Sequence, residues 1–190
     1  MNRADSVAQL KAVWAILAED MGKAVEYGRA ANTPYAQRAL VRAFFAAVEG
    51  LSYQLRQVTL ASLANTNLLS LGEVALLREE RYTLDNKGHP KASLAYLSFP
   101  ESLLFSISIY AKNHGAKFEV DRGAPGWQAF QTAVALRNSV THPKTPESLA
   151  PSNAELQALM DASRWWHDTL LGLFRACDEA DDFWCSKLGP

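Results

Sequence analysis

The chain has 190 residues, of which 48% are hydrophobic and 21% charged, a balance typical of a soluble globular protein with one sizeable core. The chain has 19 basic and 20 acidic side chains, which gives a formal net charge of −1. The protein as a whole is therefore not positively charged, so any nucleic-acid binding must use local basic patches. Cys177 and Cys185 are predicted to be free thiols, although a disulfide between them stays open. With no signal peptide, membrane-length apolar run or zinc-type Cys/His cluster visible, we expect a cytoplasmic protein that needs no membrane, metal or cofactor.

Two long helices are predicted for the N-terminal third of the chain. Residues 4–31 carry apolar side chains at helical spacing, and Asp5 or Ser6 is suited to cap the start of this helix. A second helix is predicted over 34–64, ended by the polar run Asn-Thr-Asn at 65–67. Its expected core face is Leu40, Phe44, Ala47, Leu51, Leu55 and Val58.

A charged stripe follows the opposite side of this second helix. Its members are spaced four, seven and seven residues apart, and they are Arg38, Arg42, Glu49 and Arg56. The stripe is either a solvated face or a surface that meets a dimer partner or RNA, with Arg42 as a candidate RNA-binding cation. The flanking rings of Phe45 and Tyr53 favour a contact surface.

The middle of the chain is predicted to be less regular. Ser70 stands three residues before Glu73, which is capping-box spacing, so a short helix is expected over 70–81. Residues 85–88 form a turn signal after a short stretch that could be a strand, but no sheet is predicted over 82–99. His89 in this loop is expected to be exposed, with an RNA-contacting edge as the alternative. A helix over 100–114 then ends at Gly115, and 116–126 form a connecting loop.

The C-terminal part is predicted to hold a linker, a long helix and a tail. Three prolines within 143–151 predict a stiff, extended linker. The last helix is expected over 152–178, with His167 inside its apolar stripe as a hydrogen-bonded core or interface side chain. The acidic tail at 179–190 is expected to fray, so the single domain is assigned to 1–178.

The most informative stretch ends the helix predicted over 127–142. At about 100° per residue, Arg137 shares a side with apolar residues, whereas Asn138 and His142 lie four positions apart on the adjoining polar edge. Pro143 disfavours helical geometry at His142, so the helix should end there. A guanidinium on an apolar face is costly unless it has a partner or an anionic ligand.

The residues Arg137, Asn138 and His142 resemble the R-polar-x(3–5)-H motif of HEPN domains, which often reads "RN…HP" as it does here. The resemblance implies an all-α antiparallel bundle of five to six helices, and a homodimer whose two motifs share one cleft. Many HEPN proteins are metal-independent endoribonucleases that act as toxins or in antiviral defence. It therefore implies an RNA substrate and a neutralising antitoxin or other partner protein.

The resemblance suggests roles for two further residues. Many HEPN proteins carry a polar or acidic residue on an early helix that orients the motif arginine, and Glu49 is the candidate partner for Arg137 here. Lys144 stands where HEPN toxins paired with nucleotidyltransferase antitoxins often carry a tyrosine, so regulation through such a tyrosine is not expected. The lysine instead adds a positive charge that suits phosphate binding.

The residue chemistry is compatible with RNA cleavage. The 2′-hydroxyl of RNA is its own nucleophile, so catalysis needs a proton-transfer group near neutral pKa and a cation at the phosphate. We assign the first role to His142 and the second to Arg137, with Asn138 bonding the phosphate or fixing the histidine tautomer. Two alternatives stay open: a non-catalytic helical module that binds a nucleotide, RNA or protein, and a purely structural dimerisation domain in which Arg137 pairs with Glu49.

Overall fold

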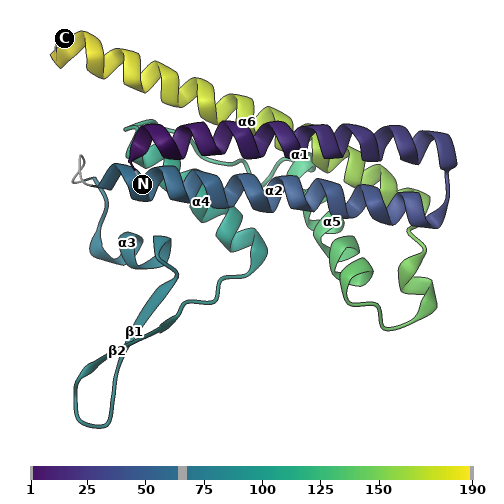
Figure 1. Cartoon of the computed structure of the whole chain (residues 1–190), viewed down its shortest axis with the longest axis horizontal. Helices are drawn as coiled ribbons and strands as arrows, with labels where there is room; N and C mark the ends of the chain where they lie inside the picture. Colours follow the sequence, from purple (N-terminus) through teal and green to yellow (C-terminus); the bar gives the residue numbers. More distant parts are fainter. Residues whose placement is uncertain (1, 64–67, 189–190) are drawn as a thin grey trace.

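The computed structural model describes residues 2–63 and 68–188, and in that part of the chain the fold is an all-α bundle, as predicted, with one small hairpin that was not predicted. The predicted break at 65–67 lies outside the described residues. The elements are α1 (Arg3–Ala31), α2 (Pro34–Ser62), α3 (Leu71–Leu77), β1 (Glu80–Leu84), β2 (Pro90–Leu94), α4 (Phe99–Asn113), α5 (Pro125–Thr141), the 3₁₀ turn η2 (Pro146–Leu149) and α6 (Asn153–Leu188). Figure 1 shows α1 and α2 side by side as a long helical hairpin, with β1 and β2 projecting away from the bundle.

Helix α2 is the central element, because it packs against α1, α4 and α5. Five of the six predicted core residues are at most 2% exposed, and only Leu40 is half-buried. Phe45, predicted to flank the charged stripe, is instead 2% exposed. Its ring lies 5.0 Å from Phe44 and 6.1 Å from Phe130 of α5, so aromatic packing ties α2 to α5.

The long helices begin at side-chain caps. Asn2 caps α1 by accepting a hydrogen bond from the Asp5 amide at 2.9 Å, so the predicted cap at Asp5 or Ser6 is wrong. The Ser6 hydroxyl instead donates to the Asn2 carbonyl oxygen. Thr33 caps α2, and Pro34 occupies the first helical turn, where its missing amide proton costs nothing.

The segment between α2 and α4 differs most from its prediction. The Ser70–Glu73 capping box is present, but α3 ends at Leu77 instead of continuing to residue 81. Glu79 then takes a left-handed backbone with φ 58°, and the chain turns into an antiparallel pair of strands where no sheet was predicted. The predicted turn closes this pair, with the Asp85 amide donating to the His89 carbonyl oxygen at 2.9 Å. His89 is exposed, as expected.

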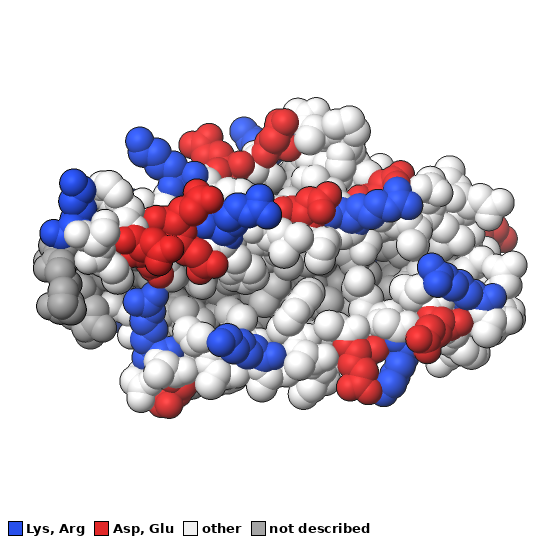
Figure 2. Space-filling model, turned by 90° about the horizontal axis from the view of Figure 1, so that it is seen from above, with Lys and Arg blue, Asp and Glu red and all other residues white. Residues whose placement is uncertain are grey.

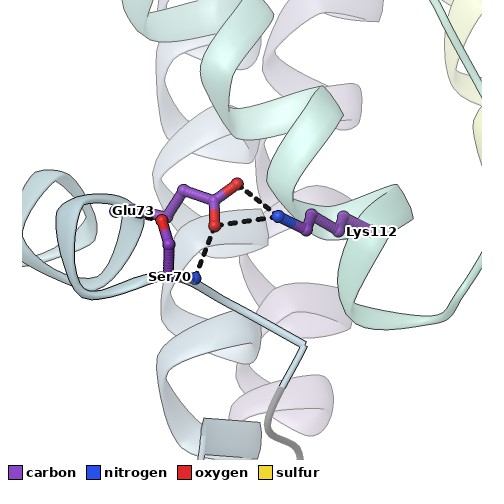
Figure 3. A network of polar contacts seen from close by, with 3 residues as sticks. All are labelled: Ser70, Glu73 and Lys112. Carbon is purple, nitrogen blue, oxygen red and sulfur yellow. Dashed lines mark hydrogen bonds and ion pairs between the residues drawn. The ribbon is translucent and has the colours of Figure 1, made fainter.

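An ionic contact ties helix α3 to helix α4 of the bundle. The Glu73 carboxylate accepts from the Ser70 amide at 2.6 Å and from the Lys112 ammonium of α4 at 2.7 and 2.9 Å (Figure 3). Glu73 therefore caps its own helix and anchors it to α4 at the same time.

Three predictions for the C-terminal part are wrong. The proline-rich linker is not extended throughout, because residues 146–149 form a 3₁₀ turn. Helix α6 begins after Ser152, which caps it through Glu155, and it continues to Leu188 instead of fraying after residue 178. His167 is exposed, so its predicted place in the core is wrong, while a place in an interface stays a prediction. The buried face lies one position away and comprises Leu159, Ala162, Trp166, Leu170, Leu173 and Cys177. Cys177 and Cys185 are free thiols, as predicted.

Candidate functional site

The motif arginine lies in the last turns of α5 and is paired with the predicted partner on α2. The Arg137 Nη2 atom lies 2.6 Å from the Glu49 Oε1 atom. The Arg137 side chain is 27% exposed and that of Glu49 is 42% exposed, so the guanidinium is not fully buried as its position on an apolar face implied. Its central carbon stands 5.9 Å from the centre of the Phe99 ring, which covers one side of the cation.

Asn138 connects the arginine to the end of the helix. Its side-chain oxygen accepts from Arg137 Nη1 at 3.2 Å, and its backbone carbonyl accepts from the His142 amide at 2.9 Å. His142 is the C-cap residue, with φ −126° and ψ 64°, so the helix ends where Pro143 predicts. The helix end thus places an amide and an imidazole side by side in solvent.

A depression of about 330 Å³ opens beside this helix end. Its lining residues are Asn138, Ser139, His142, Lys144 and Ser148. Three of the sequence-predicted site residues therefore meet in one place, and Arg137 adjoins the depression through Asn138 without lining it. Within 2–63 and 68–188, neither the His142 ring nor the Lys144 ammonium has a hydrogen-bond or ion-pair partner, so both are available to a ligand.

The charged stripe of α2 contacts segments of its own chain. Arg38 donates to the Leu149 carbonyl oxygen at 2.6 Å, Glu49 pairs with Arg137, and Arg56 donates to Ser102 and Glu79 at 2.8 and 3.2 Å. The interpretation as a solvated face is therefore wrong for Arg56, whose side chain is 12% exposed. A surface that meets a dimer partner or RNA stays a prediction. Arg42 differs, since it is exposed and has no hydrogen-bond or ion-pair partner in the described part of the chain.

Ser139 and Ser148 belong to the depression but were not singled out in the sequence. Ser139 is one of the unspecified motif positions, so the motif gave no reason to select it. Ser148 comes from the segment that was predicted to be extended, and the 3₁₀ turn brings it back to the helix end. The Arg38 bond to the neighbouring Leu149 secures that turn.

Charge is locally mixed on the molecular surface. On the face seen in Figure 2, basic and acidic side chains are interspersed over the long helices. Among the described residues, no group of three or more His, Cys, Asp or Glu side chains is arranged to hold a metal ion. No helix in the same residues is long and apolar enough to cross a membrane.

The chain was compared with protein-family models, curated proteins and solved structures, and none of the three comparisons finds a match.

Proposed function

We propose that this chain is a metal-independent endoribonuclease whose active site is the depression at the end of α5. The observation that carries the proposal is the meeting of His142, Lys144 and Asn138 in one solvent-open depression with Arg137 directly beside it. A proton-transfer group, two cations and an amide are the groups that cleavage by an internal 2′-hydroxyl requires.

The proposed reaction conserves atoms and charge. The neutral His142 imidazole accepts the proton of a ribose 2′-hydroxyl, and the 2′-oxygen forms a bond to the adjacent phosphorus. The bond from phosphorus to the 5′-oxygen breaks, and that oxygen takes a proton from the imidazolium of His142 in the second copy, which leaves a 2′,3′-cyclic phosphate and a 5′-hydroxyl. Arg137 and Lys144 stabilise the negative charge on the phosphate oxygens, with Arg42 as a further contact along the RNA.

A homodimer with a composite site follows from the same chemistry. Each copy supplies one histidine to its depression, whereas the reaction needs a group that accepts a proton and a group that donates one. Two depressions that face each other would supply both. Activity per copy should then fall in parallel with the dimer fraction on dilution, measured by sedimentation; undiminished activity of the monomer would refute the composite site.

The test of the ribonuclease is cleavage of a mixed-sequence RNA in EDTA. Arg137→Ala and His142→Ala should each lower the rate by at least about 100-fold, and wild-type products should carry cyclic-phosphate ends. His167→Ala is the matched control, because His167 is also exposed on a helix but lies outside the depression. Cleavage that survives both substitutions would refute the assignment.

One observation favours a second function, a non-catalytic binding module. The Arg137 guanidinium is already paired with Glu49 and covered by Phe99, so it can fix the helix end without touching a ligand. A module of this kind would bind a nucleotide, RNA or protein at Lys144 and Asn138. In that case Lys144→Ala should weaken binding, His142→Ala should have little effect, and the wild type should leave RNA intact.

The biological role implied by the HEPN resemblance, a toxin or antiviral-defence effector held in check by a partner protein, belongs to this proposal. Expression of the wild-type chain in a bacterial host should slow growth, and expression of His142→Ala should not. Equal growth with both chains would argue against a toxin.

A further inference from the structure

The β1–β2 hairpin has one apolar and one basic face, both in water. Cross-strand partners share a face, so the pairs Tyr82–Ala92, Leu84–Pro90 and Glu80–Leu94 lie together. This face is therefore apolar except at Glu80, whose carboxylate accepts from the Tyr82 hydroxyl. Tyr82 is 57% exposed, and Leu84 and Leu94 are each 71% exposed. The pairs Arg81–Ser93 and Thr83–Lys91 make up the opposite, basic face. An isolated two-stranded hairpin is marginal in water, so an uncovered apolar face of this kind indicates a partner.

The outer edge of β1 is free to accept another strand. The Asp85 amide donates to the His89 carbonyl oxygen, and the Ala95 amide donates to the Glu79 carbonyl oxygen. Along an antiparallel ladder, residue pairs that exchange backbone hydrogen bonds alternate with pairs that do not. The amides and carbonyls of Glu80, Tyr82 and Leu84 therefore point away from β2, toward the outer edge of the sheet. The outer edge of β2 is the weaker template, since Pro90 has no amide proton.

The charges of the hairpin are unbalanced in favour of cations. The Asp85 carboxylate accepts from the Lys87 and His89 amides at 2.8 and 2.9 Å, and Glu80 accepts from the Tyr82 hydroxyl at 2.6 Å. By contrast, Arg81 and Lys91 are exposed and have no acidic partner within the described ranges. The basic face is therefore complementary to acidic side chains.

We propose that β1 binds an extended segment of a partner protein in which acidic and apolar side chains alternate. A strand added at this edge places successive side chains on opposite faces of the sheet. Its apolar residues would continue the face of Tyr82 and Leu84, and its acidic residues would stand beside Arg81. Lys91 lies on the same face one strand further away and adds to the positive charge there. This interaction is independent of the proposed ribonuclease activity.

Two other occupants fit the hairpin less well. An RNA strand would meet the cations on one face and Tyr82 on the other, so it could not use both at once. A second copy could pair its β1 edge with the first through a two-fold axis perpendicular to the sheet. The basic faces of the two hairpins would then lie on the same side of the joined sheet. The Arg81 and Lys91 cations of the two copies would then repel one another.

The test is selection from a random dodecapeptide phage library on the full chain. Sequences that alternate acidic and apolar residues should be enriched on the wild type. They should be lost on Tyr82→Pro, which removes one outward amide without removing a ladder bond. Ala92→Pro is the matched control, because Ala92 faces Tyr82 across the ladder and its amide points to the other edge. Enrichment of non-alternating sequences, no enrichment, or equal selection on Tyr82→Pro would overturn the proposal.

Binding of a fluorescently labelled copy of the most enriched peptide tests the contribution of charge in variants that keep the hairpin backbone intact. Arg81→Glu should weaken its binding by about tenfold, while Lys11→Glu, the same charge change on exposed α1, should leave binding unaltered. An equal effect of the two reversals would overturn the assignment to the hairpin. Stronger binding of an oligouridylate that depends on Arg81 would favour RNA instead, and dimerisation lost in Tyr82→Pro would favour a second copy.

Discussion

At the scale of single residues, Arg137 shows what a helix position and a family resemblance predict together. Its place on an apolar side of α5 required a partner for the cation, and the HEPN resemblance pointed to Glu49, 88 positions earlier, whose carboxylate lies 2.6 Å away. The same projection placed Asn138 and His142 together, and both line the depression. A residue's helical face can therefore be read from spacing, because side-chain direction follows backbone geometry.

His167 shows where such a projection fails. Adjacent positions on a helix differ by about 100°, and two neighbouring stripes of α6 are both largely apolar. The choice between them depends on which one faces α5, and the large ring of Trp166 occupies the core at 3% exposure. Only the packing partner decides this, and the sequence of α6 does not contain that information.

Glu49 provides a prediction at this scale. Because the ion pair with Arg137 is partly exposed, Glu49→Ala should lower the free energy of unfolding by only about 0–1 kcal/mol. If Glu49 positions Arg137 at the phosphate, the same change should lower RNA cleavage by about 10- to 100-fold, with Glu49→Gln intermediate. Rates and urea unfolding, measured on the same samples, give the two effects separately.

The control for this substitution is Glu79→Ala, which removes the comparable partner of Arg56 at 3.2 Å. It should change stability by a similar amount and leave cleavage unaltered. If Glu49→Ala and Glu79→Ala reduced cleavage equally, Glu49 would have no positioning role.

At the scale of elements, most turns and most helix bounds were predictable, whereas the cap of α1, the sheet and the lengths of α3 and α6 were not. The box at Ser70, the stop at Gly115 and the turn before Gly88 all form as their residues indicate, because each is a local backbone preference. The sheet was missed because its strands are short and exposed, which leaves no buried face to set a pattern. The extension of α6 beyond residue 178 was likewise invisible, since acidic composition argued for fraying.

The attachment of α3 should depend on pH. The hydrogen bond from Lys112 is the main cause that lowers the pKa of Glu73 below its ordinary value of 4.5. Because the folded pKa is depressed, this stabilisation is fully present above the ordinary pKa and is lost as pH falls through the folded pKa. Amide exchange in α3, corrected for intrinsic rates, should therefore show protection that is constant near neutral pH and declines below about pH 4.5.

Glu73→Gln tests this explanation. The amide cannot titrate, so α3 should be about 0.5–1.5 kcal/mol less protected at neutral pH and should show no acid-dependent step. Glu101→Gln changes the matching acid in the α4 capping box, which has no lysine partner among the described residues, and should leave the α3 profile unchanged. A step that persists in Glu73→Gln would assign it to another group.

At the scale of the whole molecule, the fold class followed from the helical spacing of apolar residues, because only a bundle buries five or six such stripes at once. The arrangement of the bundle depends on contacts far apart in sequence. One of these is the corner where α4 meets α6, which buries two groups that must stay neutral. Burial raises the pKa of the Cys177 thiol to about 12 from 9.0, and that of the Tyr110 phenol to about 12 from 10.0.

This corner should make the bundle sensitive to alkali. Since both folded pKa values are raised, the unfolded chain loses these protons first, so stability is full below pH 9.0 and declines as pH rises toward 12. Between pH 9.0 and 10.5 the thiol alone should account for about 2 kcal/mol of lost unfolding free energy, measured by urea titration. Cys177→Ala should remove that part of the decline, whereas Cys185→Ala, a change at the exposed thiol, should retain it. An identical decline in both variants would show that α4 and α6 do not depend on the neutral thiol, and that the alkaline loss arises elsewhere in the bundle.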